Sequence, residues 1–590
     1  MLSEPKCQNC QSQFKIAQED FEFYKKIQVP PPTFCPDCRL QRRYAFRNER
    51  ALYKDVCDLC GKQMISAYSP DKPFKVYCRE CWYSDKWDGL DYGMDYDFSK
   101  PFFPQWHELE KRVPRMGLLS IGSSVNSDFA NYVWNVKDVY MSYSTINSES
   151  VIFSKSVDKS KDMADCFAVK DSEKCYECMD GANNFNCAFL LLSRNCLDSK
   201  FLFDCVNSQS CFMSSNLRSK QFVFRNKQLT ADQYQKEVAK VNFGDHDVLS
   251  QLKSEFKKLW SESLHQYANA AKTTNSIGDN MENVKESQYV FESYDVENSK
   301  FLVRLIGVKD CYDLTHSGNS QLVYEGVAGM NNAYNIRMCS QCPDTTEAIY
   351  SDWCLNCSNI FGCDGLRKKE YCILNRQYSK EDYFALCDKI MSQMDSLPFK
   401  DRGGRVYKFG EFFPIELSPF TYNEAVVNEY FPLTKDQALA SGYSWHDPDE
   451  AAYKPTMKAE DLPKDIKDAS DSLLKEVISC GSCHKAFKII ARELAFLRQQ
   501  GLTLPRKCPN CRHADRLAMR LYRANVPIAG TPIGWPCATL LSCGIVTVCV
   551  RALSLKHLLV SPGKTGRNMR MVRRSAPINL KLLLRQNAPK

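Results

Sequence analysis

"DSKFLF" occupies residues 198–203, and "NSKFLV" occupies residues 298–303. Both are variants of one phrase: a small polar pair, then Lys, Glu or Gln, then apolar or aromatic residues. Further copies are "NSESVIF" from 147, "DSEKCY" from 171 and "NSQSCF" from 207. Short β-forming runs between Asn, Asp and Ser turns indicate strands, and repetition at a small period is typical of a solenoid. The phrase therefore predicts a stacked β-structure.

The spacing of the phrase suggests how the coils are built. Its serines recur at steps of 9 to 12 residues, apart from two longer gaps. We predict a β-solenoid with two strand-and-turn units per coil, in which each coil stacks its apolar row on the next. Because the steps are irregular, an antiparallel stack of sheets remains the alternative.

The repeat region is itself duplicated. "LRSKQFVFRNKQLTADQY" from 217 matches "LRKKEYCILNRQYSKEDY" from 366. Each copy predicts a helix after Thr230 or Ser379, residue types that are good N-caps. Such a helix would close the open end of a solenoid. Between the copies, one amphipathic helix is predicted by the spacing of Leu249, Leu252, Phe256, Leu259, Trp260, Leu264 and Tyr267.

A second repeated line lies outside the repeat region. "CPDCRLQRR" at 35–43 and "CPNCRHADR" at 508–516 are near-copies, and each ends a pattern of CxxC, 24 residues and CxxC. Two such knuckles complete a tetrahedral Zn²⁺ shell. The first pattern consists of Cys7, Cys10, Cys35 and Cys38, and the last consists of Cys480, Cys483, Cys508 and Cys511.

A third pattern follows the first, with 17 residues between its pairs: Cys57, Cys60, Cys78 and Cys81. We predict three zinc sites; the alternative is a set of buried or redox-active cysteines. Consecutive knuckles could pair in sequence, or the four N-terminal pairs could cross-brace. His484 and His513 lie beside the last cysteines, but Gln11 and Leu40 take their places in the first copy, so we do not assign them as ligands.

A basic stretch follows the second cysteine pair of each near-copy. Guanidinium groups match phosphates bidentately, so an arginine-lined helix there predicts contact with RNA or DNA. The alternative is a solvated face, or packing against acidic residues of the zinc unit itself. In the first copy one helical face carries Arg39, Arg43, Arg47 and Arg50. The stretch after the last copy carries Arg512, Arg516, Arg520 and Arg523.

Cysteines also occur inside the repeats. Cys178, Cys187, Cys196 and Cys205 are nine residues apart and predict a stacked interior row, because cysteine is small and often buried. The pairs Cys339-x2-Cys342 and Cys354-x2-Cys357 have ribbon spacing instead and make a fourth metal site possible.

The amino-acid composition indicates the cellular compartment and shows where the net charge lies. No basic-then-apolar segment opens the chain, so its 30 cysteines are expected to be reduced thiols in the cytoplasm. Residues 521–590 carry 11 of the 78 Lys and Arg but no acid, which leaves 67 basic against 70 acidic side chains in residues 1–520. The apolar run in this tail ends at Arg551, too short to span a membrane. We interpret the tail as a frameshift product, and a genuine basic tail is the alternative.

We therefore expect a mixed, β-rich fold. Small zinc-ribbon or treble-clef-like units at both ends would flank a duplicated β-solenoid-like region with closing helices. The expected divisions are zinc unit A (1–56), zinc unit B (57–100), repeat lobe 1 with its closing helix (126–245), a linker helix (246–275), repeat lobe 2 with its closing helix (276–395), a connector (396–479), zinc unit C (480–520) and the tail (521–590).

Catalytic signatures are weak. Residues 82–98 gather aromatic residues with Asp85, Asp88, Asp91, Asp95 and Asp97, but a polar connector explains them better than acid–base chemistry. The sequence contains no glycine-rich phosphate loop, no GxSxG and no HExxH. We therefore expect no nucleotide cofactor and assign no catalytic residue.

Several stretches resemble one family. They are "FCPDCRLQRRYAFRNERALYK", "YSPDKPFKVYCRECWYSDKWD", "EFFPIELSPFTYNEAVVNEYFPLT" and "LPRKCPNCRHADR". On these residues the chain resembles uncharacterised multi-zinc-ribbon (CxxC-repeat) proteins of candidate-phyla, Patescibacteria-type bacteria, over most of 1–520. The resemblance implies zinc and this architecture, and no activity. Such proteins would continue with further metal-type cysteine pairs, where this chain has its tail.

Two functions fit these observations. In the first, the zinc units grip RNA or DNA while the repeats act as a spacer. In the second, zinc staples the ends of a repeat domain that serves as a protein–protein scaffold. A glycan-acting enzyme on the solenoid is a remote third option, based on fold analogy alone.

Overall fold

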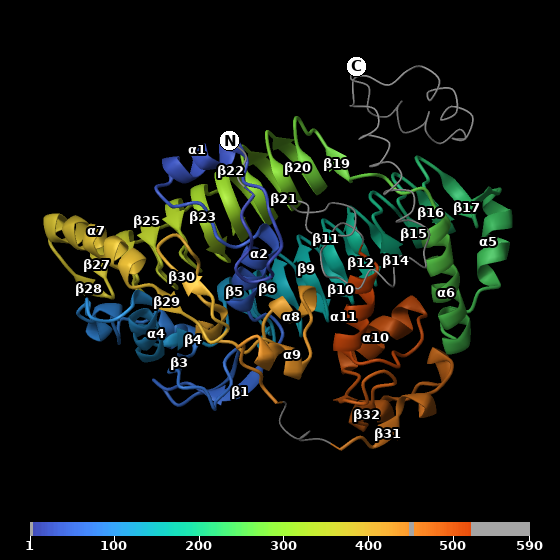
Figure 1. Cartoon of the computed structure of the whole chain (residues 1–590). Coiled ribbons are helices and arrows are strands. Elements are labelled where there is room, and N and C mark those ends of the chain that lie inside the picture. The colour runs from blue at the N-terminus through green and yellow to red at the C-terminus, as the bar shows by residue number, and fades with distance from the viewer. Residues whose placement is uncertain (1–3, 448–453, 521–590) are drawn as a thin grey trace, which may run out of the picture. The chain divides into compact units, whose positions relative to one another are not determined.

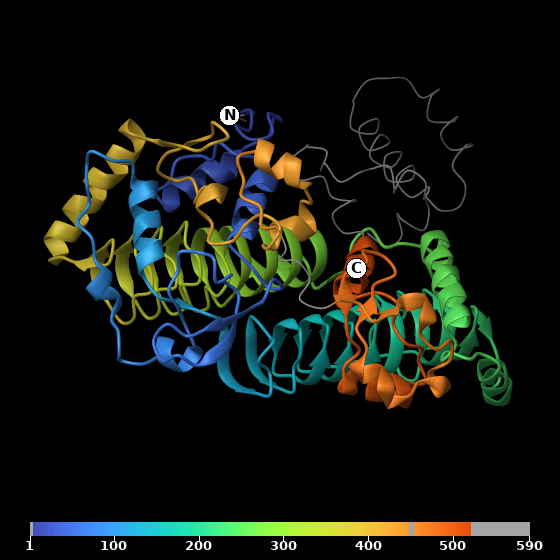
Figure 2. The same ribbon diagram turned by 90° about the horizontal axis from the view of Figure 1, so that it is seen from below.

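The computed structural model describes residues 4–447 and 454–520, and all of these belong to one compact unit. The tail at 521–590, with Arg523 and the frameshift interpretation, lies outside the described residues. Two stacks of parallel strands form the centre of the described chain (Figures 1 and 2). We call them lobe 1, from β5 to β18, and lobe 2, from β19 to β28.

In lobe 1 the strands from β5 to β17 pair in parallel, mostly with partners twelve residues apart, and β18 pairs antiparallel with β17 at the end. Lys161, for example, has Glu149 and Glu173 as its in-register partners. The pairings of β6 to β14 close on themselves, because β12 also pairs with β14, so these nine strands of the described chain form a closed parallel arrangement. The strands are β5 (Ser120–Val125), β6 (Val133–Lys137), β7 (Tyr143–Ile146), β8 (Glu149–Ile152), β9 (Lys155–Asp158), β10 (Lys161–Ala164), β11 (Phe167–Lys170), β12 (Glu173–Tyr176), β13 (Met179–Ala182), β14 (Phe185–Leu191), β15 (Lys200–Phe203), β16 (Gln209–Ser215), β17 (Gln221–Phe224) and β18 (Lys227–Gln228).

Lobe 2 repeats this arrangement as a long parallel sheet. Its partners are also mostly twelve residues apart, as for Thr346 and Ser358. The predicted repeated β-structure is confirmed, and the antiparallel alternative is wrong for both stacks. The strands are β19 (Ala270–Ala271), β20 (Ile277–Lys285), β21 (Gln288–Glu297), β22 (Lys300–Gly318), β23 (Gln321–Val327), β24 (Tyr334–Arg337), β25 (Thr346–Ile349), β26 (Ser358–Phe361), β27 (Glu370–Ile373) and β28 (Arg376–Gln377).

The backbone bends at every third residue. Asn147, Ser150, Phe153, Ser156 and Lys159 all have φ between 45° and 57°. This left-handed conformation is the one that Asn and Asp adopt most readily, which explains the Asn- and Asp-rich phrase in the sequence. Four bends complete a coil of twelve residues, and the residue after each bend points into the coil.

The interior of such a narrow coil holds Ser, Cys and aliphatic side chains, and its serines complete the backbone hydrogen bonding. Ser148 Oγ donates to the carbonyl of Ile146 (2.7 Å) and accepts from the amide of Ser160 one coil later (3.1 Å). Ser160 repeats the pattern with the carbonyl of Asp158 and the amide of Ser172. The recurring serines are therefore interior residues that satisfy the corners of the coil.

The lobe cysteines take the same interior positions. Cys187 Sγ lies 3.3 Å from the carbonyl of Phe185 and 3.5 Å from that of Cys196. The predicted nine-residue row is wrong in its register: stacked cysteines are twelve residues apart, like Cys175 and Cys187. Residues nine apart lie on adjacent sides of successive coils, because each side is three residues long.

Both closing helices begin where predicted. Thr230 caps α5 (Ala231–Ala239) and Ser379 caps α7 (Lys380–Ser396), each through its side-chain oxygen. The linker helix α6 (His246–Glu262) buries Leu249, Leu252, Phe256 and Trp260, but it ends before Leu264 and Tyr267, which are exposed.

The remaining elements surround the lobes. Those of the N-terminal part are α1 (Gln18–Lys26), α2 (Pro36–Ala45), β1 (Tyr53–Val56), β2 (Gln63–Ser66), β3 (Val76–Tyr77), α3 (Arg79–Trp82), α4 (Phe102–Arg112) and β4 (Arg115–Met116). Those of the C-terminal part are β29 (Phe399–Lys400), β30 (Val406–Tyr407), α8 (Val427–Tyr430), α9 (Lys435–Ala440), β31 (Met457–Lys458), β32 (Ile478–Ser479), β33 (Ala486–Phe487), α10 (Ala491–Gln500) and α11 (Pro509–Ala518).

Removing one interior hydroxyl tests the role of the serines. Ser160→Ala leaves the amide of Ser172 without its partner, so we expect a loss of about 1–3 kcal/mol in the free energy of unfolding. The measurement is the denaturant midpoint. Ser123→Ala, at an exposed position, is the matched control and should change stability by less than about 0.5 kcal/mol. Equal midpoints for the two variants would contradict the proposed role.

Candidate metal centres

Three groups of four cysteines bring their sulfur atoms together. In each group the Sγ atoms lie within 4.8 Å of one another, and each could hold a metal ion such as zinc. The groups follow the chain, so the knuckles pair in sequence and do not cross-brace. Unit A contains Cys7, Cys10, Cys35 and Cys38; unit B contains Cys57, Cys60, Cys78 and Cys81; unit C contains Cys480, Cys483, Cys508 and Cys511.

All three units place their cysteines in the same way. The first pair lies in a tight turn that ends in a left-handed residue: Gln11 in unit A, Gly61 in unit B and His484 in unit C. The second pair lies at a helix start, where Cys35, Cys78 and Cys508 are the N-cap residues of α2, α3 and α11. Helix N-termini favour negative charge, so this position stabilises thiolates.

The distances fit a tetrahedral metal shell. Cys10 Sγ lies 3.7 Å from Cys35 Sγ, and Cys483 Sγ lies 3.7 Å from Cys508 Sγ. Tetrahedral Zn²⁺ with bonds of about 2.3 Å would separate its sulfurs by about 3.8 Å. The sulfurs also accept backbone hydrogen bonds, such as that from the amide of Cys508 to Cys480 Sγ (3.2 Å).

The environment of Cys480 favours its thiolate. Burial opposes ionisation, but hydrogen bonds from the backbone of Cys483, Cys508 and Ser482 outweigh it and lower the pKa of Cys480 to about 6. Only thiolates ligate metal, so this effect prepares the unit for a cation.

Neither His484 nor His513 belongs to one of the sulfur groups found among the described residues. His513 is buried and its Nε2 lies 3.4 Å from Glu429 Oε2. Burial and the Arg50 charge lower the pKa of His513 to about 3.

The possible fourth site is not among these sulfur groups. Cys339, Cys342, Cys354 and Cys357 are buried in the interior of lobe 2, and they form no four-sulfur group in the part of the chain that the structure describes. Their strands and bends carry on the twelve-residue coil, so the spacing reflects the repeat instead of two metal knuckles.

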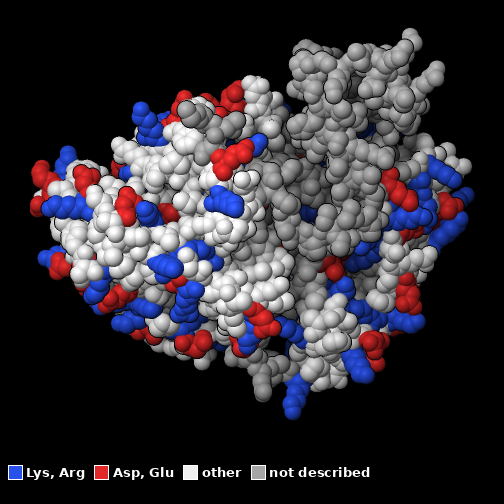
Figure 3. Space-filling model, in the orientation of Figure 1, with Lys and Arg blue, Asp and Glu red and all other residues white. Residues whose placement is uncertain are grey.

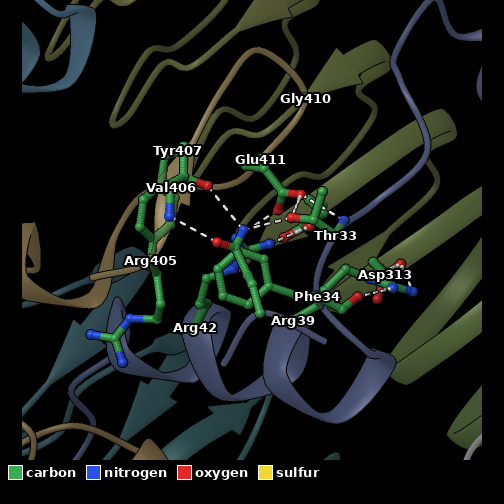
Figure 4. Close-up of polar contacts among 12 residues, drawn as sticks. Thr33, Phe34, Arg39, Arg42, Asp313, Arg405, Val406, Tyr407, Gly410 and Glu411 are labelled. Atoms are coloured by element: carbon green, nitrogen blue, oxygen red, sulfur yellow. Dashed lines mark hydrogen bonds and ion pairs between the residues drawn. The ribbon is translucent and has the colours of Figure 1, made fainter. Parts of the chain in front are cut away.

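The arginines of α2 are paired with acids of lobe 2. Arg39 pairs with Asp313 at 2.8 Å (Figure 4), and Arg43 pairs with the other oxygen of Asp313 at 3.0 Å. Arg42, which the helical-face prediction omitted, pairs with Glu411 at 2.8 Å (Figure 4) and also with Glu325 at 2.7 Å. All three guanidinium groups are at most 2 % exposed. No sequence signal marked Arg42, because a residue directly before Arg43 does not share its helical face.

The arginines of α11 point into lobe 1 in the same way. Arg512 pairs with Asp165 and Glu493, both at 2.8 Å, and Arg516 pairs with Asp165 at 2.7 Å. Just beyond the helix, Arg520 pairs with Asp180 (2.6 Å). These side chains are at most 7 % exposed.

The acidic partners in the two lobes correspond to one another. Asp165 and Glu177 in lobe 1, and Asp313 and Glu325 in lobe 2, stand twelve residues apart at left-handed bends, and the two pairs are offset by 148 residues. The partners differ at one position: Glu325 pairs with an arginine of α2, whereas Glu177 pairs with Lys253 of α6. The docking is therefore crosswise: the N-terminal unit attaches to lobe 2, and the C-terminal unit attaches to lobe 1.

The segment after unit A also contacts unit C. Arg50, which follows unit A, donates to Asn510 Oδ1 of unit C (2.6 Å) and lies 3.7 Å from Glu429 of α8. Lys155 of lobe 1 is fully buried between Glu49 (2.6 Å) and Glu429 (2.8 Å). One polar and ionic junction thus connects the segment after unit A, unit C, lobe 1 and the connector.

Most arginines of the predicted faces are taken up by ion pairs within the fold. Arg39, Arg43, Arg47, Arg512 and Arg516 are buried and ion-paired, and the side chains of Arg520 and Arg50 are 3 and 14 % exposed. Contact with RNA or DNA through these residues stays a prediction. Helical periodicity reveals which residues share a face, but it cannot reveal whether that face meets solvent or a distant acidic column.

The aspartates of residues 82–98 serve as a connector. Asp88 binds Lys369 (2.7 Å) and Asp95 binds Arg376, so this segment attaches to the end of lobe 2. Arg367 lies over the ring of Trp87 nearby (4.7 Å).

Comparison with known proteins gives no relative: no protein-family model and no curated protein matches the chain. No helix among the described residues is long and apolar enough to cross a membrane.

Metal analysis tests the sulfur groups. We expect three Zn²⁺ per chain, and two after Cys483→Ser, because loss of one thiolate opens the shell of unit C. Cys342→Ser, inside lobe 2, is the matched control and should leave three. Zinc content is measured on purified protein by elemental analysis, and an equal loss in both variants would contradict the assignment.

A second buried cluster makes stability depend on pH. Arg115 lies among three carboxylates: Glu110 (2.9 Å), Asp352 (3.0 Å) and Asp364 (3.0 Å). Burial raises the pKa of Asp352 from 3.8 to about 7, against the opposing effect of Arg115. The folded state therefore holds a proton that the unfolded state releases between these two values.

We expect this contribution to stability to be complete below pH 3.8 and lost as pH rises towards 7. Asp352→Asn mimics the protonated form, so its free energy of unfolding should fall less over this range, by about 1–3 kcal/mol. The measurement is the denaturant midpoint of both proteins against pH, with exposed Asp128→Asn as control. Parallel curves for the wild type and Asp352→Asn would contradict the assignment.

Proposed function

We propose that this chain is a non-enzymatic, zinc-binding scaffold that captures a protein partner. Two β-solenoid lobes would carry the binding surface. Three structural Zn²⁺ ions in treble-clef-like units would fix the helices that bind these lobes together. The observation that carries the proposal is the burial of the arginines beside units A and C in ion pairs with the lobes.

The sulfur groups support a structural role for the metal. Four cysteines fill a tetrahedral shell and leave no position for water or substrate, whereas catalytic zinc keeps one position open. Each shell also fixes the start of a helix, and in α2 and α11 that helix presents its arginines within its first three turns.

The ion pairs favour a scaffold over a nucleic-acid grip. Asp313 accepts from both Arg39 and Arg43, and its side chain is fully buried. If a phosphate took these arginines, Asp313 would remain as an unpaired buried charge, which costs about 3–5 kcal/mol. Phosphate binding would therefore compete directly with the fold.

The visible surface is consistent with a protein partner. On the face shown in Figure 3, Lys and Arg alternate with Asp and Glu among many uncharged residues, and no extended field of one sign appears there among the described residues. Residues 1–520 have slightly more acidic than basic side chains. Non-specific nucleic-acid binding relies on clustered positive charge.

The clamp can be tested by removing one metal. Cys10→Ser should open unit A, release α2 and expose Asp313 and Glu325. We expect hydrogen exchange at the backbone amides of α2, β22 and β23 to increase at least about tenfold, while lobe 1 keeps its protection. Cys342→Ser is the control and should not release α2. Unchanged exchange in Cys10→Ser would contradict the clamp.

The metal-loaded wild-type chain is then titrated with single-stranded and duplex RNA and DNA at increasing salt. We expect no binding at low salt. An observed association constant that falls steeply with salt would mean that several phosphates are neutralised, and it would support the nucleic-acid grip over the scaffold.

A further inference from the structure

One exposed column of lobe 1 alternates in charge. Its members occupy equivalent positions on successive coils, and each is the in-register partner of the next. We call it the charge column; in order it consists of Val125, Lys137, Glu149, Lys161, Glu173 and Phe185.

The column is open to solvent. The side chains of Lys137, Glu149, Lys161 and Glu173 are 56, 38, 53 and 42 % exposed. All six members line one open cleft of about 970 Å³. Exposed charges of alternating sign therefore follow one another along a cleft that the described residues do not cover.

The charge column is complementary to a second copy of itself. Read from either end, it presents an apolar residue, four charges of alternating sign and an apolar residue. If a second column runs antiparallel against it, every charge meets its opposite: Lys137 faces the second copy's Glu173, and Glu149 faces its Lys161. Coils are about 4.8 Å apart in both copies, so the spacing matches along the whole column.

We propose that this face is a two-fold interface between two copies of the chain. Isologous interfaces need a surface that is complementary to itself, and an alternating column of even length meets that condition. Val125 would meet the second copy's Phe185 at both ends of the column, which covers two side chains that are 46 and 40 % exposed. The proposal concerns lobe 1 alone and does not depend on the function of the zinc units.

Two exposed apolar residues lie around the corner from the column, on the adjacent side of the coil. Trp134 and Ile146 are in-register partners on β6 and β7 and are 37 and 38 % exposed. They are not part of the proposed contact, which consists of the charge column and its two apolar ends.

Ion pairs between neighbouring residues of the column in one copy do not explain why the charges alternate over four coils. Glu149 contacts Lys137 (2.9 Å) and Lys161 (3.8 Å), but such exposed ion pairs contribute at most about 1 kcal/mol. In lobe 2 the equivalent column reads Lys285, Glu297, Lys309 and Gln321. It lacks the second acid, so it is not self-complementary and provides a control.

Two charge reversals in the full chain test the interface. Lys137→Glu and Glu173→Lys each place two like-charged contacts in a homodimer, so each should weaken self-association about tenfold or more. Mixed in equal amounts, the two variants form a heterodimer in which all four contacts are again between opposite charges. We therefore expect the mixture to dimerise as the wild type does.

Mass is measured by sedimentation over a range of protein concentrations, at low and high salt. Lys285→Glu, in lobe 2, should dimerise like the wild type. A wild-type chain that stays monomeric throughout, or a mixture that associates no better than its two components, would overturn the proposal. Because the readout is association between copies, failure here leaves the metal clamp untouched, and failure of the clamp leaves this interface untouched.

Discussion

The narrow coil is the constraint on which the structure depends. A bend at every third residue leaves twelve residues per turn and an interior wide enough only for side chains such as Ser, Cys, Val and Leu. Because each bend directs one side chain outward at the same place in every coil, residues twelve apart form columns on the surface. Those columns position the helices beside units A and C: Asp313 and Glu325 form ion pairs with arginines of α2, and Asp165 forms ion pairs with arginines of α11.

Burying arginine against these acidic columns is favourable only when the geometry is fixed. The desolvation of Arg39, Arg43 and Asp313 is costly, and their mutual attraction offsets it only at short, well-oriented contacts. The cysteine groups lie where they can fix that orientation, since Cys38 directly precedes Arg39 and Cys511 directly precedes Arg512. In the clamp that we propose, the sulfur shell and the ion pairs act as one unit.

Local signals in the sequence predicted local structure well. Paired CxxC knuckles led to the three sulfur groups, and the N-cap residues Thr230 and Ser379 marked the closing helices. The register of the coils was less accessible, because Ser and Cys occupy every side of the interior and the steps between them include multiples of three other than twelve. The role of the arginines could not be predicted, since Arg39 and Asp313 are 274 residues apart and no local pattern links them.

The crosswise docking has a consequence for how the chain is made. The arginines of α2 leave the ribosome before their partners in lobe 2, which follow 270 to 283 residues later. During that interval three cationic side chains have no native counter-ion, and lobe 1 is complete before the unit that covers it exists. The last contacts to form involve the greatest sequence separations, which slows folding and prolongs the exposure of intermediates. Synthesis of this protein is therefore expected to need protection of its N-terminal segment until both lobes have emerged.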